Sequence, residues 1–182
     1  MEYLMTYGWA ILIIAIVLGA LYLLGVFSAP VPTGCIVAAP YYCQNPIMGT
    51  GGTLSFTLGQ NSGSTEYNIG LGCAATTTAN GLPYTGSTTA TSDGFYFLGT
   101  SGAVSGNTLP ANTLTLSSGQ QIPVSGVQCW SSSGALESAS GIAIGTGFTG
   151  KLWVNYTSSS GAPGPSNTWQ TAEIGTVSVK AT

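Results

Sequence analysis

Hydrophobic and polar residues are unevenly distributed along the chain, and the first segment is the most apolar. From Gly8 to Phe27 there are 20 consecutive residues without a charge, a side-chain amide or a proline, and most of them are Ile, Leu, Ala or Val. With a rise of about 1.5 Å per residue, such a run forms a helix of about 30 Å, which matches the hydrocarbon core of a bilayer. The pattern predicts a long hydrophobic α-helix over residues 1–28, able to span a membrane.

Beyond residue 34 the pattern changes to short runs of β-branched and aromatic residues with alternating polarity, separated by Gly, Ser, Asn and Pro. Strands are predicted within residues 53–59, 66–72, 94–99, 112–119, 121–130, 141–150, 151–157 and 172–181. No helical periodicity follows Phe27. Strands at this spacing are typical of a sandwich or barrel. We expect an α+β chain, in which the helix is followed by an all-β, Ig-like antiparallel sandwich head over residues 35–182.

A short proline-rich segment, residues 29–34, separates these two parts. Pro30 and Pro32 favour a stiff, extended backbone and prevent the helix from continuing. A tethered binding module more often has a long Gly/Ser linker, whereas a filament needs each head fixed relative to its helix. The segment is therefore expected to be a stiff linker.

The low content of charged residues excludes one class of function. Charged residues make up 4% of the chain, with five acids, two bases and no histidine, whereas an average protein has about 25%. A nucleic-acid-binding protein needs clustered Lys and Arg to displace counterions from phosphates, so this class is excluded. The 44% of hydrophobic residues favours a folded chain over a disordered one.

All four cysteines lie after the hydrophobic segment, and their even number is typical of two disulfides in an oxidising compartment. Three connectivities are possible. We favour Cys35 with Cys43, a local loop, and Cys73 with Cys129, a bridge between distant strands. A zinc site is disfavoured because no pair has C-x-x-C spacing and the chain has no histidine.

The hydrophobic helix has three possible functions: a signal peptide, a membrane anchor or a packing element of an assembly. A cleaved signal has a basic n-region and an apolar region of about 7–15 residues, whereas this segment is longer and has Glu2 at its start. We expect that a basic leader has already been removed. Gly8, Gly19 and Gly25 would let neighbouring helices approach closely, although small residues are common in any apolar helix. A Glu2 carboxylate suits a helix N-terminus, and if buried among sister helices it would pair with a terminal amine.

The first residues follow a specific pattern: Glu-Tyr-Leu, then Tyr-Gly-Trp-Ala, then an aliphatic helix. In this pattern the chain resembles the mature N-terminus of archaeal type IV pilins, the products of class III signal peptides. The matching positions are Glu2, Tyr3, Leu4, Tyr7, Gly8, Trp9 and Ala10. The stretches "CIVAAPYYC", "TLSFTLGQNSG" and "GTGFTGKLWVNYTSSS" are also similar to those pilins. The family's mature chain usually begins with a Gln a few residues before the Glu, and this sequence has neither that Gln nor a leader.

The resemblance implies a function. The chain would be a structural subunit of an archaeal type IV pilus, an extracellular adhesive filament in which each copy binds other copies of itself. Before assembly it would sit in the cytoplasmic membrane by its helix, with the leader removed by a prepilin peptidase. A pilus-assembly ATPase and membrane platform would then extrude it. The residues expected at the assembly contacts are Glu2, Tyr3, Tyr7, Gly8, Trp9, Gly19 and Gly25.

Catalytic chemistry is not expected, and neither a cofactor nor a metal is implied. Nucleophilic catalysis through Ser or Cys needs a base, and no histidine is present. Asp93 and Glu137 could form a carboxylate pair of the glycosidase type, but both lie in turn-like contexts where solvated acids are ordinary. The glycines of "GTGFTG" precede no helix, so they do not predict a phosphate site.

Asn155 lies in "NYT", the only N-x-S/T sequon in the chain. It is a candidate glycosylation site on an extracellular head, and the alternative is an unmodified asparagine that points outward from a strand. With so few charges, attached sugars would help to keep the head soluble.

Two further functions remain as alternatives. The chain could be a monomeric, membrane-anchored surface adhesin with a β-sandwich that binds carbohydrate or protein. An archaellin-like rotary filament subunit is a closer relative of the pilins, but its N-terminal pattern lacks Tyr-Gly-Trp-Ala.

Overall fold

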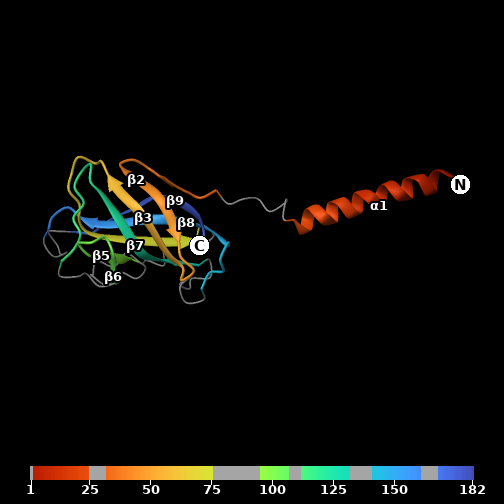
Figure 1. Cartoon of the computed structure of the whole chain (residues 1–182). Coiled ribbons are helices and arrows are strands. Elements are labelled where there is room, and N and C mark those ends of the chain that lie inside the picture. Colours follow the sequence, from red (N-terminus) through yellow and green to blue (C-terminus); the bar gives the residue numbers. More distant parts are fainter. Residues whose placement is uncertain (1, 25–31, 76–94, 107–111, 132–140, 161–167) are drawn as a thin grey trace. The chain divides into compact units, whose positions relative to one another are not determined.

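The computed structural model describes residues 2–24, 32–75, 95–106, 112–131, 141–160 and 168–182, with the backbone alone for residues 2–6 and 104–106 (Figure 1). The chain divides into two compact units, Met1–Val31 and Pro32–Thr182. The first contains the helix α1 (Glu2–Leu23), and the second is a β domain.

Helix α1 is shorter than the helix predicted over residues 1–28, because it ends at Leu23. The amide of Leu24 still donates to the carbonyl of Ala20 at 3.0 Å, and the next residue in the sequence is Gly25, a poor helix former. In the described part of the chain, no helix has the length and apolar character needed to cross a membrane. The prediction of an apolar helix over residues 1–28, long enough to span a membrane, is therefore wrong.

The β domain contains nine named strands within its described residues. They are β1 (Gly34–Val37), β2 (Tyr41–Met48), β3 (Thr53–Gln60), β4 (Tyr67–Ala75), β5 (Tyr96–Leu98), β6 (Val104–Gly106), β7 (Gln121–Trp130), β8 (Gly147–Thr157) and β9 (Gln170–Lys180). All belong to one sheet, in the order β1-β9-β8-β4-β7-β3-β2, and β5 pairs with both β4 and β6.

This topology corrects the predicted Ig-like antiparallel sandwich. A sandwich has two separate sheets, whereas here a single sheet curls until β1 and β2, the strands at the two ends of its order, lie against each other. The sheet is also not purely antiparallel, because β4 and β7 pair in parallel at Cys73 and Cys129. The nearly closed, barrel-like sheet buries its concave face, and alternating side chains fill it just as they would fill the space between two sheets.

The main core lies on the concave face and follows from the alternation in the strands. Along β3, for example, Leu54, Phe56 and Leu58 are buried while the residues between them are partly exposed. β8 and β9 form the longest antiparallel pair, from Gly147↔Lys180 to Tyr156↔Gln170. A second, smaller cluster contains the buried Ala74 and Phe95, packed against Trp130 and Trp153.

One glycine fixes the turn between β5 and β6. Gly102 has a φ of 79°, a conformation that side chains disfavour, and its amide donates to the carbonyl of Gly99 at 2.9 Å. A Cβ atom at Gly102 would collide with the backbone carbonyl of Pro123 in β7. The turn can therefore pack on β7 only because this residue has no side chain.

Candidate functional site

The exposed side chains of α1 form the first candidate surface, which we call the assembly surface (within Tyr7–Leu23). Successive helical side chains point about 100° apart, and the four consecutive residues Ile11, Leu12, Ile13 and Ile14 have exposed fractions of 66%, 52%, 55% and 58%. The helix is therefore apolar in every direction. A helix of this kind needs apolar surroundings on all sides, from lipid or from protein.

The residues predicted for assembly contacts are only partly within the described side chains. Tyr7 and Trp9 are exposed on α1, at 67% and 73%, and a Cβ atom at Gly8 or Gly19 would meet no atom within 4 Å. These positions leave room for a neighbouring helix to approach closely. For Glu2 and Tyr3, which lie in α1, the side chains are outside the description, and Gly25 lies outside the described residues.

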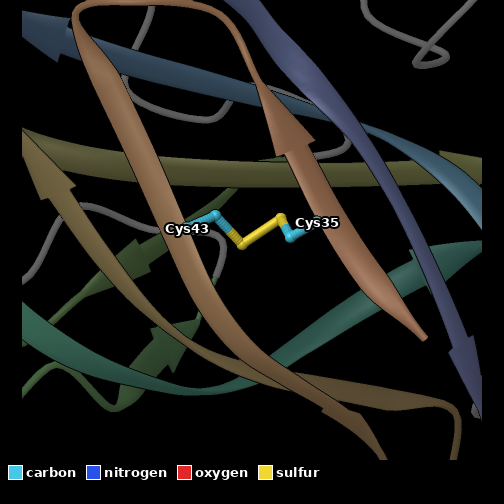
Figure 2. Close-up of a disulfide and its surroundings, with 2 residues drawn as sticks. All are labelled: Cys35 and Cys43. Carbon is cyan, nitrogen blue, oxygen red and sulfur yellow. A yellow bond between two sulfur atoms is a disulfide. The ribbon is translucent and has the colours of Figure 1, made fainter.

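The predicted pairing of Cys35 with Cys43 is confirmed, with a Cα–Cα distance of 5.8 Å. Figure 2 shows the bridge joining β1 to β2, which lie side by side. We call β1, β2 and this bridge the seam, because they bring together the two ends of the sheet. β1 and β2 are not paired by backbone hydrogen bonds, and the Cys35–Cys43 disulfide links these two ends of the sheet covalently.

The second predicted pair, Cys73 with Cys129, is also confirmed and has a Cα–Cα distance of 4.5 Å. The two cysteines are directly opposite each other in the parallel pair of β4 and β7. Both are fully buried in the main core. This bridge fixes the register at the place where the sheet departs from an antiparallel arrangement.

A surface cavity of about 580 Å³ lies at the seam. It is lined by Thr33, Gly34, Cys35, Cys43, Gln44, Asn45, Pro46 and Ile47. In β2 the pairing with β3 is interrupted between Gln44 and Ile47, where Asn45 has a φ of 50° and Pro46 lacks an amide hydrogen. Such irregularities protect a sheet edge from pairing with another strand. The lining contains no ionisable side chain, because both of its cysteines are bridged.

A buried acidic group lies inside the β domain, where Glu66 is only 2% exposed. The hydroxyl of Tyr41 donates to Glu66 Oε1 at 2.8 Å, and Glu66 Oε2 has no hydrogen-bond partner. The hydroxyl of Tyr156 donates to Gln170 Oε1 at 2.9 Å and is electrostatically coupled to Tyr41 and Glu66. We call Tyr41, Glu66 and Tyr156 the Glu66 cluster.

Burial dominates the ionisation of this cluster. It raises the pKa of Glu66 above its ordinary value of 4.5, and the hydrogen bond from Tyr41 opposes that shift in part. Burial also raises the pKa of Tyr41, and the neighbouring Glu66 raises it further. Both hydroxyls and the carboxyl therefore favour their neutral forms.

The sequence alone did not predict the Glu66 cluster, because a β-bulge changes the alternation in β4. Ile69, Leu71 and Cys73 point into the core, so strict alternation would place Glu66 on the opposite face. The register shift between Tyr67 and Gly70 inserts one residue, and this reverses the faces before it. The one signal in the sequence that could have indicated it is a glutamate directly before a mostly apolar strand.

Asn155, the candidate glycosylation site, is fully buried in β8. Its Oδ1 accepts a hydrogen bond from Thr171 Oγ1 at 3.2 Å, and its Nδ2, the atom that would carry a glycan, is buried without a partner. The folded domain leaves this atom inaccessible, so a glycan at Asn155 is incompatible with the packing of β8.

Asp93 and Glu137 lie outside the described residues. Within the described ranges, no group of three or more His, Cys, Asp or Glu could hold a metal ion. The glycines of "GTGFTG" lie in a turn and at the start of β8 rather than before a helix.

Comparison of the chain with protein-family models, with curated proteins and with solved structures gave no match.

Proposed function

We propose that this chain is a structural subunit of an extracellular filament similar to the archaeal type IV pilus, in which α1 of each copy packs against α1 of other copies. The single observation that carries the proposal is the assembly surface, which is apolar and exposed in every direction. Together with the N-terminal pattern Glu-Tyr-Leu and Tyr-Gly-Trp-Ala, this surface favours a helix that packs against the α1 helices of other copies.

The physical chemistry of burial supports this proposal. Each large aliphatic side chain removed from water contributes about 1.5–3 kcal/mol, and α1 exposes a continuous series of them, including Ile11, Ile14, Ile16 and Leu18. A bundle of α1 helices would bury them on every face. Filament subunits joined in this way would dissociate into water only at a large cost in free energy.

The composition of the β domain suits an extracellular location. Both pairs of cysteines are oxidised, which is typical of proteins outside the reducing cytosol. Biogenesis would follow the route of the pilins, with a prepilin peptidase that removes a leader and an ATPase with a membrane platform that adds subunits to the filament.

The test compares two lysine substitutions of exposed isoleucines. Ile14→Lys places a charge in the middle of the assembly surface, while Ile144→Lys places one on the β domain, where Ile144 is 78% exposed. Because a buried, unpaired ammonium is costly, Ile14→Lys should abolish filaments in electron micrographs of the native cell surface. Ile144→Lys should retain them.

Three measurements decide the outcome. Near-UV circular dichroism should show the same folded β domain in both variants. Sedimentation should show polymers for the wild type and for Ile144→Lys, but not for Ile14→Lys. Cryo-electron microscopy of the filament should place α1 at its axis. Filaments of normal length from Ile14→Lys would contradict the proposal, and wild-type protein that is recovered only as monomers would favour a surface adhesin instead.

A further inference from the structure

The carboxyl of Glu66 is buried without any cation to balance a negative charge. The chain contains only two basic side chains, Lys151 and Lys180. Lys151 Nζ pairs with the carboxylate of Glu173 at 3.1 Å on the surface, and Lys180 is exposed. Neither interacts with Glu66, whose polar contact is the Tyr41 hydroxyl. An ionised Glu66 would therefore be an uncompensated charge in the core.

The elements packed around Glu66 supply only neutral groups. Tyr41 faces it from β2 and Tyr156 from β8, while the backbone of Glu66 pairs with that of Leu116. Gln60 of β3 is also buried, but its amide donates to the carbonyls of Ser64 and Leu116. Since no neighbour stabilises a charge except through one hydroxyl, the neutral acid is the form that this interior accommodates.

The rest of the described β domain depends little on ionised carboxylates. Lys151–Glu173 is its one ion pair, and both side chains are more than a third exposed, so the pair contributes little. Acid usually unfolds proteins by protonating carboxylates that are paired in the native state. Here there are almost none to protonate.

We propose that the β domain is built for acidic surroundings: Glu66 is buried as the neutral acid, and the domain loses stability as rising pH forces this group to ionise. The inference concerns the β domain alone and does not depend on whether the chain forms filaments.

The direction of the pH dependence follows from linkage. The pKa of Glu66 is raised in the folded state by burial, so between its ordinary value and the raised value the native state binds more protons than the unfolded state. The stabilisation is complete below pH 4.5 and is lost as the pH rises through the folded pKa. This trend is opposite to ordinary acid denaturation.

The first experiment measures unfolding of the full chain in mild detergent with guanidinium at a series of pH values from acid to about pH 8, below the ordinary pKa of tyrosine. The apparent unfolding constant of the wild type should increase with pH, by at most about tenfold per pH unit within the window, since one proton is involved. Glu66→Gln should remove this increase. Glu173→Gln, at an exposed carboxylate, should retain it.

The outcome that overturns the inference is a wild type that becomes more stable as pH rises above 4.5, or a Glu66→Gln variant with the same pH profile as the wild type. A second measurement remains decisive if Glu66→Gln fails to fold. Infrared spectra of wild-type protein labelled with ¹³C-carboxyl glutamate should show one protonated carboxyl at about pH 6, where ordinary glutamates are ionised. That band should disappear on unfolding. Its absence from the native protein would refute the proposal.

Discussion

The hydroxyl of Tyr41 has a larger role than a single hydrogen bond suggests. It is the only donor to the carboxyl of Glu66 among the described residues, at 2.8 Å, and Tyr41 itself is 8% exposed in the main core. Without it, both oxygens of a buried carboxyl would lack a partner. Such groups are costly because water cannot replace the lost contact.

Replacement of Tyr41 by phenylalanine is therefore expected to lower the free energy of unfolding by about 1–3 kcal/mol. The matched control is Tyr42→Phe, because the Tyr42 hydroxyl donates to the carbonyl of Gln120 at 3.1 Å in an exposed position. Its removal should cost less than about 0.5 kcal/mol, since water can take its place. Guanidinium unfolding at about pH 4 measures both values. Equal losses would show that the hydrogen bond to Glu66 contributes no more to stability than the exposed one.

Single residues were predictable from the sequence only where they act through covalent chemistry. The even number of cysteines predicted two bridges, and the favoured one of three possible pairings is the one in the structure. The burial of Asn155 was not predictable, because a sequon gives the residue type but not its surroundings. Glu66 was missed for a similar reason: one inserted residue before Gly70 reverses the face on which it lies.

At the scale of elements, alternating hydrophobicity predicted most of the long strands. The segments 53–59, 66–72, 121–130, 151–157 and 172–181 all lie largely within β3, β4, β7, β8 and β9. The alternation works there because each strand has one face in the core. It failed over 112–119, where Leu114 and Leu116 are buried but only Thr113 and Leu116 pair, each in an isolated bridge, and over 141–146, which precedes β8.

The strands β1 and β2 were not predicted, and the reason is physical. β1 spans only Gly34–Val37, and β2 contains Pro46 and the irregularity at Asn45. Both are edge strands, where short length, proline and bulges are tolerated. A sequence pattern calibrated on regular strands cannot detect elements that are irregular because of their position.

The stability of the turn between β5 and β6 should depend on Gly102. Gly102→Ala combines a disfavoured φ of 79° with a collision against the Pro123 carbonyl, and should lower the free energy of unfolding by more than about 1–3 kcal/mol, the cost of backbone strain alone. Gly119→Ala is the control, since Gly119 has a φ of 83° and no atom within 4 Å of an added Cβ.

Thermal unfolding followed by circular dichroism gives both values. The control should show the strain without the collision, so its melting temperature should fall less than that of Gly102→Ala. If the two variants melt together, the contact between the β5–β6 turn and β7 contributes nothing to stability.

At the scale of the whole molecule, the sequence predicted two parts and a mostly β head but not the way the sheet closes. Alternating side chains fill a curled sheet and a two-sheet sandwich equally well, and the strand order, with β1 next to β9 and β4 next to β7, depends on contacts between residues far apart in the chain. The length of α1 was overestimated because the apolar run continues past Leu23, where the helix ends.

The two bridges should differ in their contribution to global stability. The loop closed by Cys73–Cys129 has a sequence separation of 56, compared with 8 for Cys35–Cys43. On the chain-entropy estimate, loss of the first costs about 4 kcal/mol and loss of the second roughly 2.5 kcal/mol. Serine pairs at each bridge, compared by guanidinium unfolding, measure the difference, and a larger loss for the seam bridge would contradict it.

The bridge between β4 and β7 also limits how far the chain can be stretched. If a pull on its two ends opened the β domain, the residues between Cys73 and Cys129, with their separation of 56, could not extend, because tension would pass directly through the sulfur atoms. At about 3.4 Å per residue, roughly 190 Å of contour length is withheld. Under mechanical load, a subunit of this kind would therefore extend less than a chain without the bridge, and it could not unravel completely while the bridge is intact.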